Sequence, residues 1–155
     1  MRTRFRQRAD DDGSATVEFV FAAVIMMVPL VYLIVAVATV QRAQLAVTNA
    51  ARNSGRAFAT AKTVEDGLIR AQVAARIAFA DAHYDGDPVV AFVAADAPSC
   101  TAPAAAPSLR AGTEFAVCVK RRLAPPGVPG FTRFEPVTVE SRYQVHIDDF
   151  RSATP

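Results

Sequence analysis

A run of 22 residues without a formal charge, from Phe19 to Val40, constrains this chain more than any other feature of its sequence. The only polar side chains in the run are those of Tyr32 and Thr39. As an α-helix rising about 1.5 Å per residue, the run is roughly 33 Å long, which suits a hydrocarbon core of about 30 Å. It therefore predicts one membrane-spanning helix, in which Pro29 removes a backbone hydrogen bond and provides a point for a kink.

The basic residues predict how this helix is oriented. Arg2, Arg4, Arg6 and Arg8 precede the run, and Arg42 is the one basic residue that follows it closely. Because basic residues resist translocation, we expect the N-terminus in the cytoplasm and the C-terminal part outside, with the chain held in the cell membrane. The net charge of +2 gives no sign of a nucleic-acid partner, so the lipid bilayer is the first partner expected.

The chain divides by composition into three regions. Residues 1–13 are a charged leader, 14–60 contain the spanning helix and its continuation beyond the membrane, and 61–155 form an exported α+β domain. Residues 41–59 are rich in alanine with polar residues at helical spacing, which predicts that the helix continues and frays near Gly55.

A second helix is indicated by Thr63 as N-cap, with Asp66 three residues later. It should end before the Asp85-Gly86-Asp87-Pro88 turn signal. Its apolar stripe, which we expect to face the core, consists of Ile69, Val73, Ile77 and Ala80.

After this turn the period becomes strand-like. The strands expected are Val89 to Ala94, Glu114 to Arg121 and Val137 to Ile147. They predict a small three-stranded antiparallel sheet, and hence an α+β fold. A proline-rich surface loop at 97–108 and a Pro-Gly-rich turn at 125–130 connect the strands.

Two cysteines, Cys100 and Cys118, lie on the predicted outer side of the membrane, where disulfides form and persist. A bond between them would tie the loop to the second strand and stabilise the domain by about 3 kcal/mol. The alternative is a pair of buried free thiols.

The segment next to the span, Gly13-Ser14-Ala15-Thr16-Val17-Glu18-Phe19, resembles the processing site of type IV prepilins. There, a membrane-embedded peptidase cuts after a glycine and leaves glutamate as the fifth residue. The resemblance implies a cut between Gly13 and Ser14, with Gly13 keeping the backbone accessible and extended. A glycine and a glutamate at this spacing also occur by chance.

Glu18 is costly at the edge of hydrocarbon unless it finds a partner. The resemblance to pilins supplies one, since the new Ser14 ammonium could pair with Glu18 of an adjacent subunit and set its register. Alternatively, Glu18 simply lies in the interfacial region.

The wider pattern resembles the TadE and TadE/TadG-like pseudopilins of the Tad (Flp) pilus system. It consists of GSATVEFVFA, a span containing proline, and QRAQLAVTNAARNSGRAFA with its NAAR and SGRA elements, over roughly the first 60 residues. This implies a minor pseudopilin that helps to assemble the pilus, remaining in the membrane or entering the fibre, without catalysis. The partners implied are the prepilin peptidase, the assembly platform and other pilin-like subunits.

Other signals favour structural interpretations. Asp81, His83, Asp85 and Asp87 begin like a calcium loop, but Phe92 occupies the twelfth position, where a bidentate glutamate is required. His146 has no second ligand nearby in sequence. Lys120-Arg121-Arg122 indicates a solvated strand end, or contact with anionic surfaces. We expect no metal, no cofactor and no enzymatic activity.

Two alternatives remain for the chain as a whole. Ala36-Val37-Ala38 offers a conventional signal-peptidase cut, which would release a secreted protein beginning at Thr39. A permanent single-pass anchor that displays an envelope-binding domain would instead keep its leader.

Overall fold

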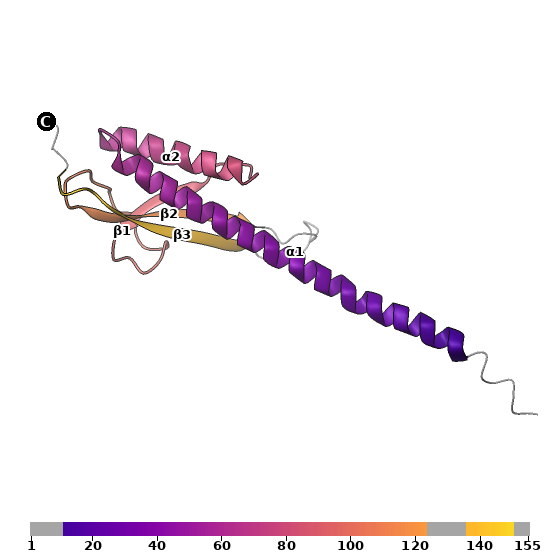
Figure 1. Ribbon diagram of the computed structural model, residues 1–155. Helices are drawn as coiled ribbons and strands as arrows, with labels where there is room; N and C mark the ends of the chain where they lie inside the picture. Colours follow the sequence, from indigo (N-terminus) through magenta and orange to yellow (C-terminus); the bar gives the residue numbers. More distant parts are fainter. Residues whose placement is uncertain (1–10, 124–135, 151–155) are drawn as a thin grey trace, which may run out of the picture. The chain divides into compact units, whose positions relative to one another are not determined.

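The computed structural model describes residues 11–123 and 136–150, so the arginine-rich start and the turn at 125–130 lie outside the described residues. The element order is α1 (Asp11–Ala59), α2 (Val64–Asp81), β1 (Val89–Ala94), β2 (Glu114–Leu123) and β3 (Val137–His146) (Figure 1). The predicted α+β class is confirmed. The chain forms two compact units, Met1–Ala38 and Thr39–Pro155.

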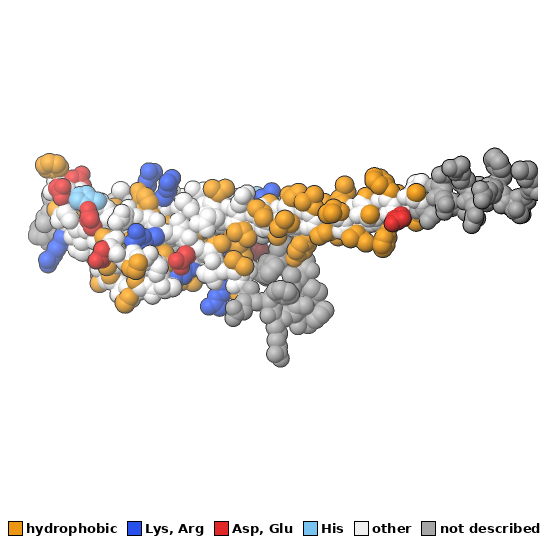
Figure 2. All heavy atoms as spheres, turned by 90° about the horizontal axis from the view of Figure 1, so that it is seen from below, with side chains coloured by type: hydrophobic (Ala, Val, Ile, Leu, Met, Phe, Trp, Pro, Cys, Tyr) orange, Lys and Arg blue, Asp and Glu red, His pale blue; other side chains and the backbone are white. Residues whose placement is uncertain are grey.

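In the first unit, α1 is apolar around its whole circumference. It continues as helix through Pro29, and the side chains from Phe19 to Leu33 are exposed. Figure 2 shows hydrophobic side chains over the visible face of this part of the helix. Within the described part of the chain, α1 is the one helix long and apolar enough to cross a membrane, which fits a single-pass membrane protein.

The second unit is built on an antiparallel sheet of order β1-β2-β3 (Figure 1). Val89 pairs with Lys120 in one ladder, and Glu114 pairs with His146 in the other. The predicted three-stranded sheet is therefore confirmed, with β2 extending to Leu123. Both faces of β2 are buried because its side chains alternate between two different layers.

The helical layer covers one face of the sheet. Side chains of Phe115, Val117 and Val119 on this face pack into two clusters with α1 and α2. The contact face of α1 carries small residues and a few larger ones at spacings of three and four: Ala43, Ala46, Val47, Ala50, Ala51, Ser54 and Phe58. Such a narrow, small-residue stripe lets the helix axis approach its neighbours closely.

Gly55 lies in this contact face, and the predicted fraying near it is wrong because α1 remains helical to Ala59. A Cβ atom at Gly55 would lie 2.7 Å from Cγ2 of Val145 and 2.8 Å from Cδ1 of Tyr143. The glycine therefore allows β3 to pack against the helix. Three turns before Gly55 in α1, Gln44 donates a hydrogen bond from Nε2 to the Glu140 carbonyl at 3.1 Å.

The predicted N-terminus of α2 is confirmed, since the Thr63 hydroxyl oxygen accepts a hydrogen bond from the Asp66 backbone N–H at 3.2 Å. The helix ends at Asp81, before the predicted turn.

The predicted core-facing stripe of α2 is wrong. Ile69, Val73 and Ile77 are 66%, 46% and 56% exposed, and Ala80 is also exposed. The buried face instead consists of Gly67, Ala71, Ala75, Ala78 and Phe79.

Side-chain size explains which face of α2 is buried. A Cβ atom at Gly67 would lie 2.8 Å from Cδ2 of Phe58, and the Ser54 hydroxyl donates to the Ala71 carbonyl at 2.8 Å. Because α1 and α2 approach so closely, only small residues fit between them, and the branched side chains face outward.

An aromatic triad joins α1 to two strands. The ring centroids of Phe58, Phe92 and Phe115 lie 5.1 to 5.8 Å apart, in tilted or edge-to-face arrangements. These geometries are favourable for aromatic pairs. The triad fixes the C-terminal end of α1 over β1 and β2.

The opposite face of the sheet is covered by the predicted proline-rich loop. Cys100 and Cys118 form the predicted disulfide, and their side chains pack with Val93, Ala97 and Ala116. Arg142 of β3 donates hydrogen bonds to the carbonyls of Ala95 and Ala97. The disulfide thus closes a third layer over β2.

We predict that Gly55→Ala destabilises the second unit. Alanine is the better helix former, but its Cβ atom would overlap Val145 and Tyr143. The free energy of unfolding of the full chain in detergent should fall by about 1–3 kcal/mol, measured by circular dichroism. Asn53→Ala, at an exposed position on the same helix, is the matched control and should be neutral or slightly stabilising. Equal stabilities of the two variants would contradict the close packing.

Removing the disulfide should also destabilise the second unit. The double variant Cys100→Ser/Cys118→Ser should lose about 3 kcal/mol, because its unfolded chain is no longer cross-linked. A reductant should lower the unfolding temperature of the wild-type chain and leave that of the double variant unchanged. If the wild-type chain were also insensitive to reductant, the bond would not contribute to stability.

Candidate assembly surfaces

The predicted cleavage site lies at the start of α1. Gly13 and Ser14 lie in α1, close to Asp11, where the described part of the helix begins. The expected extended backbone at Gly13 is therefore not what the structure has.

Glu18 follows one turn after Ser14 and directly precedes the apolar run. Its side chain is exposed, and no described residue forms an ion pair with it. An isolated carboxylate beside hydrocarbon is costly, so this position favours a partner from outside the described chain. The sequence predicted a role for this residue, but within the described part of the chain no cationic group pairs with it.

The NAAR and SGRA elements contribute both buried small residues and exposed arginines to the second unit. Their small residues Ala50, Ala51, Ser54 and Gly55 face the core. Two arginines in the same elements point away from it, and sequence reasoning did not single them out: Arg52 and Arg56. A helical wheel could have found them, since they lie opposite the small-residue stripe.

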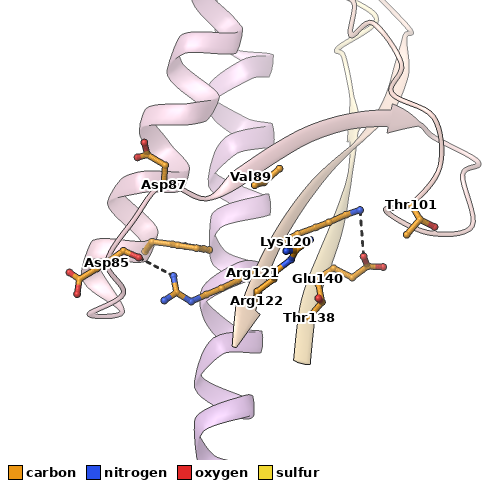
Figure 3. A pocket seen from close by; sticks show the side chains of 10 residues that line it. Asp85, Asp87, Val89, Thr101, Lys120, Arg121, Arg122, Thr138 and Glu140 are labelled. Atoms are coloured by element: carbon orange, nitrogen blue, oxygen red, sulfur yellow. Dashed lines mark hydrogen bonds and ion pairs between the residues drawn. The ribbon is translucent and has the colours of Figure 1, made fainter. Parts of the chain in front are cut away.

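A pocket at one end of the sheet gathers the Lys120-Arg121-Arg122 triplet (Figure 3). Lys120 lies 4.0 Å from the Glu140 carboxylate. Arg121 donates to the Asp85 carbonyl at 3.2 Å, and its guanidinium carbon lies 4.1 Å from the centroid of the Tyr84 ring. Two of the three cations therefore have partners within the fold, which favours the structural interpretation over an anion-binding surface.

The aspartates that resemble the start of a calcium loop do not form a metal site in the described part of the chain. The Asp87 carboxylate pairs with Arg76 at 2.6 Å, and His83 adopts a left-handed backbone conformation with φ of 57°. Over residues 11–123 and 136–150, no cluster of three or more His, Cys, Asp or Glu side chains could hold a metal.

His146 is exposed at the end of β3, as expected for a strand residue on the surface. Its Nδ1 atom lies 3.2 Å from the Glu114 carboxylate across the ladder, and its Nε2 atom lies 3.6 Å from that of Asp149. The arrangement pairs the ends of two neighbouring strands.

Comparison with known proteins identifies the N-terminal segment. Residues 13–56 match the model of a family described as TadE-like protein. The matched segment begins at Gly13, includes Glu18 and the apolar run, and ends at Arg56. No curated protein and no solved structure gave a significant match. The match supports a membrane protein related to the Tad pilus.

Proposed function

We propose, from the premise that residues 13–56 are a TadE-like segment of a membrane protein related to the Tad pilus, that this chain is a minor pseudopilin of a Tad/Flp-type system. Its role is structural, with no catalysis of its own. The observation that carries this proposal is the extent of the match, which starts at the glycine of the predicted cleavage site and ends beyond the span.

Processing by a prepilin peptidase is the first part of the proposal. A cut between Gly13 and Ser14 removes the leader on the cytoplasmic side of the membrane. The new ammonium group of Ser14 then pairs with Glu18 of an adjacent subunit. Two opposite charges at the edge of hydrocarbon are less costly as a hydrogen-bonded pair than apart, so the pair favours one register between neighbouring helices.

The second part of the proposal is that the apolar run of α1 anchors the chain in the membrane. Its side chains are exposed around the helix, so that lipid or neighbouring spans must surround them. The second unit lies outside the membrane in this proposal, where its disulfide is stable. The partners proposed are the lipid bilayer, the prepilin peptidase, the assembly platform and other pilin-like subunits.

The mass of the protein purified from cells that assemble Tad pili tests the processing step. We expect a chain that begins at Ser14 and lacks the 13-residue leader. Gly13→Leu should retain the leader, because a bulky side chain hinders access to the scissile bond. Ala9→Leu, in the same leader but away from that bond, should be processed normally.

Two other masses would contradict the proposal. A chain that keeps its leader in the presence of the peptidase would favour a permanent anchor carrying an envelope-binding domain. A chain that begins at Thr39 would indicate a conventional signal peptide.

The proposed register pair can be tested with Glu18→Ala. Leader removal and membrane insertion should remain normal, whereas the number of pili per cell should fall several-fold in electron micrographs. The reason is that the ammonium of Ser14 would be left without a partner at the edge of hydrocarbon, where a lone charge is costly. Glu65→Ala removes an exposed carboxylate elsewhere and should leave piliation unchanged. Normal piliation of Glu18→Ala would rule out the register role.

A further inference from the structure

The outward face of α2 carries a strip of branched aliphatic side chains that the fold does not use. Ile69, Val73 and Ile77 follow one another at intervals of four residues and are 66%, 46% and 56% exposed. Residues four apart lie on one face of a helix, so the three form a continuous line. We refer to them as the α2 strip.

The α2 strip borders a groove between α1 and α2, which lie side by side (Figure 1). The groove has a volume of about 390 Å³ and is mostly apolar. It is lined by Ala57 of α1, by Thr60 in the turn after α1, and from α2 by the strip together with Ala74 and Arg70. An exposed apolar surface that borders a groove is characteristic of sites that bind a protein helix.

The two arginines of the NAAR and SGRA elements lie level with this strip. Ser54 bonds to Ala71, and Phe58 packs against Gly67, so the two helices run antiparallel. Continuing the same register places Arg56 level with Ile69, and Arg52 level with Val73. Arg52 and Arg56, which we call the basic flank of α1, therefore lie at the same levels along the helix pair as two residues of the α2 strip.

These arginines differ from the arginines of α2. Arg70 pairs with Asp66 at 2.9 Å, and Arg76 pairs with Asp87 at 2.6 Å. No described residue forms an ion pair with Arg52 or Arg56. From Phe19 to Ala59 the sequence of α1 contains no acidic residue. Among the described residues, α1 thus presents two cations without an ion-pair partner, level with an apolar strip that the fold leaves exposed.

A second copy of the chain fits this surface poorly. If two α2 helices packed antiparallel around Val73, Ile69 of one would meet Ile77 of the other. The residues one turn further out, Glu65 and Asp81, would then bring carboxylates of the two copies together. Like charges in such positions oppose association, so the charge pattern favours a different chain.

We propose that the groove between α1 and α2 binds an amphipathic helix of another subunit in the assembly. The apolar face of that helix covers the α2 strip, and carboxylates along one flank of it pair with Arg52 and Arg56. This proposal rests on the proposed function, because it names the surface through which the pseudopilin meets a neighbour. Apolar burial provides the affinity, and the charge pairs fix the orientation.

Photo-crosslinking in the full chain tests the proposal. A benzophenone amino acid replaces Val73 in cells that assemble Tad pili, and cross-linked peptides are identified by mass spectrometry after irradiation. We expect one main adduct, to a segment of another pilin-like chain with an apolar face and acidic residues on one flank. Arg52→Glu/Arg56→Glu should reduce its yield several-fold, whereas Arg110→Glu, at an exposed position in a loop, should not.

Substitutions in the α2 strip provide a second measurement. Ile69→Asp should reduce adduct formation from position 73 several-fold without lowering the unfolding temperature, since the side chain is exposed. Val89→Asp makes a comparable change at a position that is 63% exposed on β1 and should have no effect. An adduct only to lipid or to a second copy, no adduct at all, or a yield insensitive to both changes would overturn the proposal.

Deleting the whole chain separates this proposal from the proposed function. If deletion leaves piliation unchanged, the pseudopilin role fails, and the adduct still shows whether an acidic helix occupies the groove. If deletion abolishes pili but no adduct forms at position 73, the groove proposal fails and the pseudopilin role stands.

Discussion

One helix has to satisfy two different environments along its length, and the rest of the molecule depends on how it does so. Between Phe19 and Val40 nearly all side chains of α1 are apolar, which suits a helix surrounded by hydrocarbon. From Ala43 onward only one face is buried. The remaining faces carry polar and basic residues such as Asn49 and Arg52.

The buried face of α1 is made mainly of small residues, and this sets the architecture of the second unit. Gly55 admits β3, while Ser54 bonds directly to the backbone of α2 at Ala71. Larger side chains enter where space remains, as with Phe58 in the aromatic triad. Behind the sheet, the disulfide loop buries the second face of β2, so that a small sheet gains two covered faces.

Close helix packing has a consequence for the outer surface. Because small residues of α2 fill the interface with α1, its branched residues remain on the outside, level with two cations of α1 that form no ion pair with a described residue. The segment that matches the TadE-like family therefore supplies most of the contact face of α1, together with Arg52 and Arg56. In the proposed function, these features and Glu18 all contribute to contacts between subunits.

The sequence by itself determined the spanning helix, the N-cap at Thr63, the three strands and the cysteine pair, because each rests on composition or on spacing within a short segment. Only the tertiary structure decided which face of α2 is buried and that α1 continues through Gly55. Hydrophobicity favoured Ile69, Val73 and Ile77 as core residues, but the distance between two helices depends on side-chain size at both surfaces at once. Neither helix carries that information alone, so the groove, and the level of Arg52 and Arg56 relative to the α2 strip, appear only when the elements are assembled.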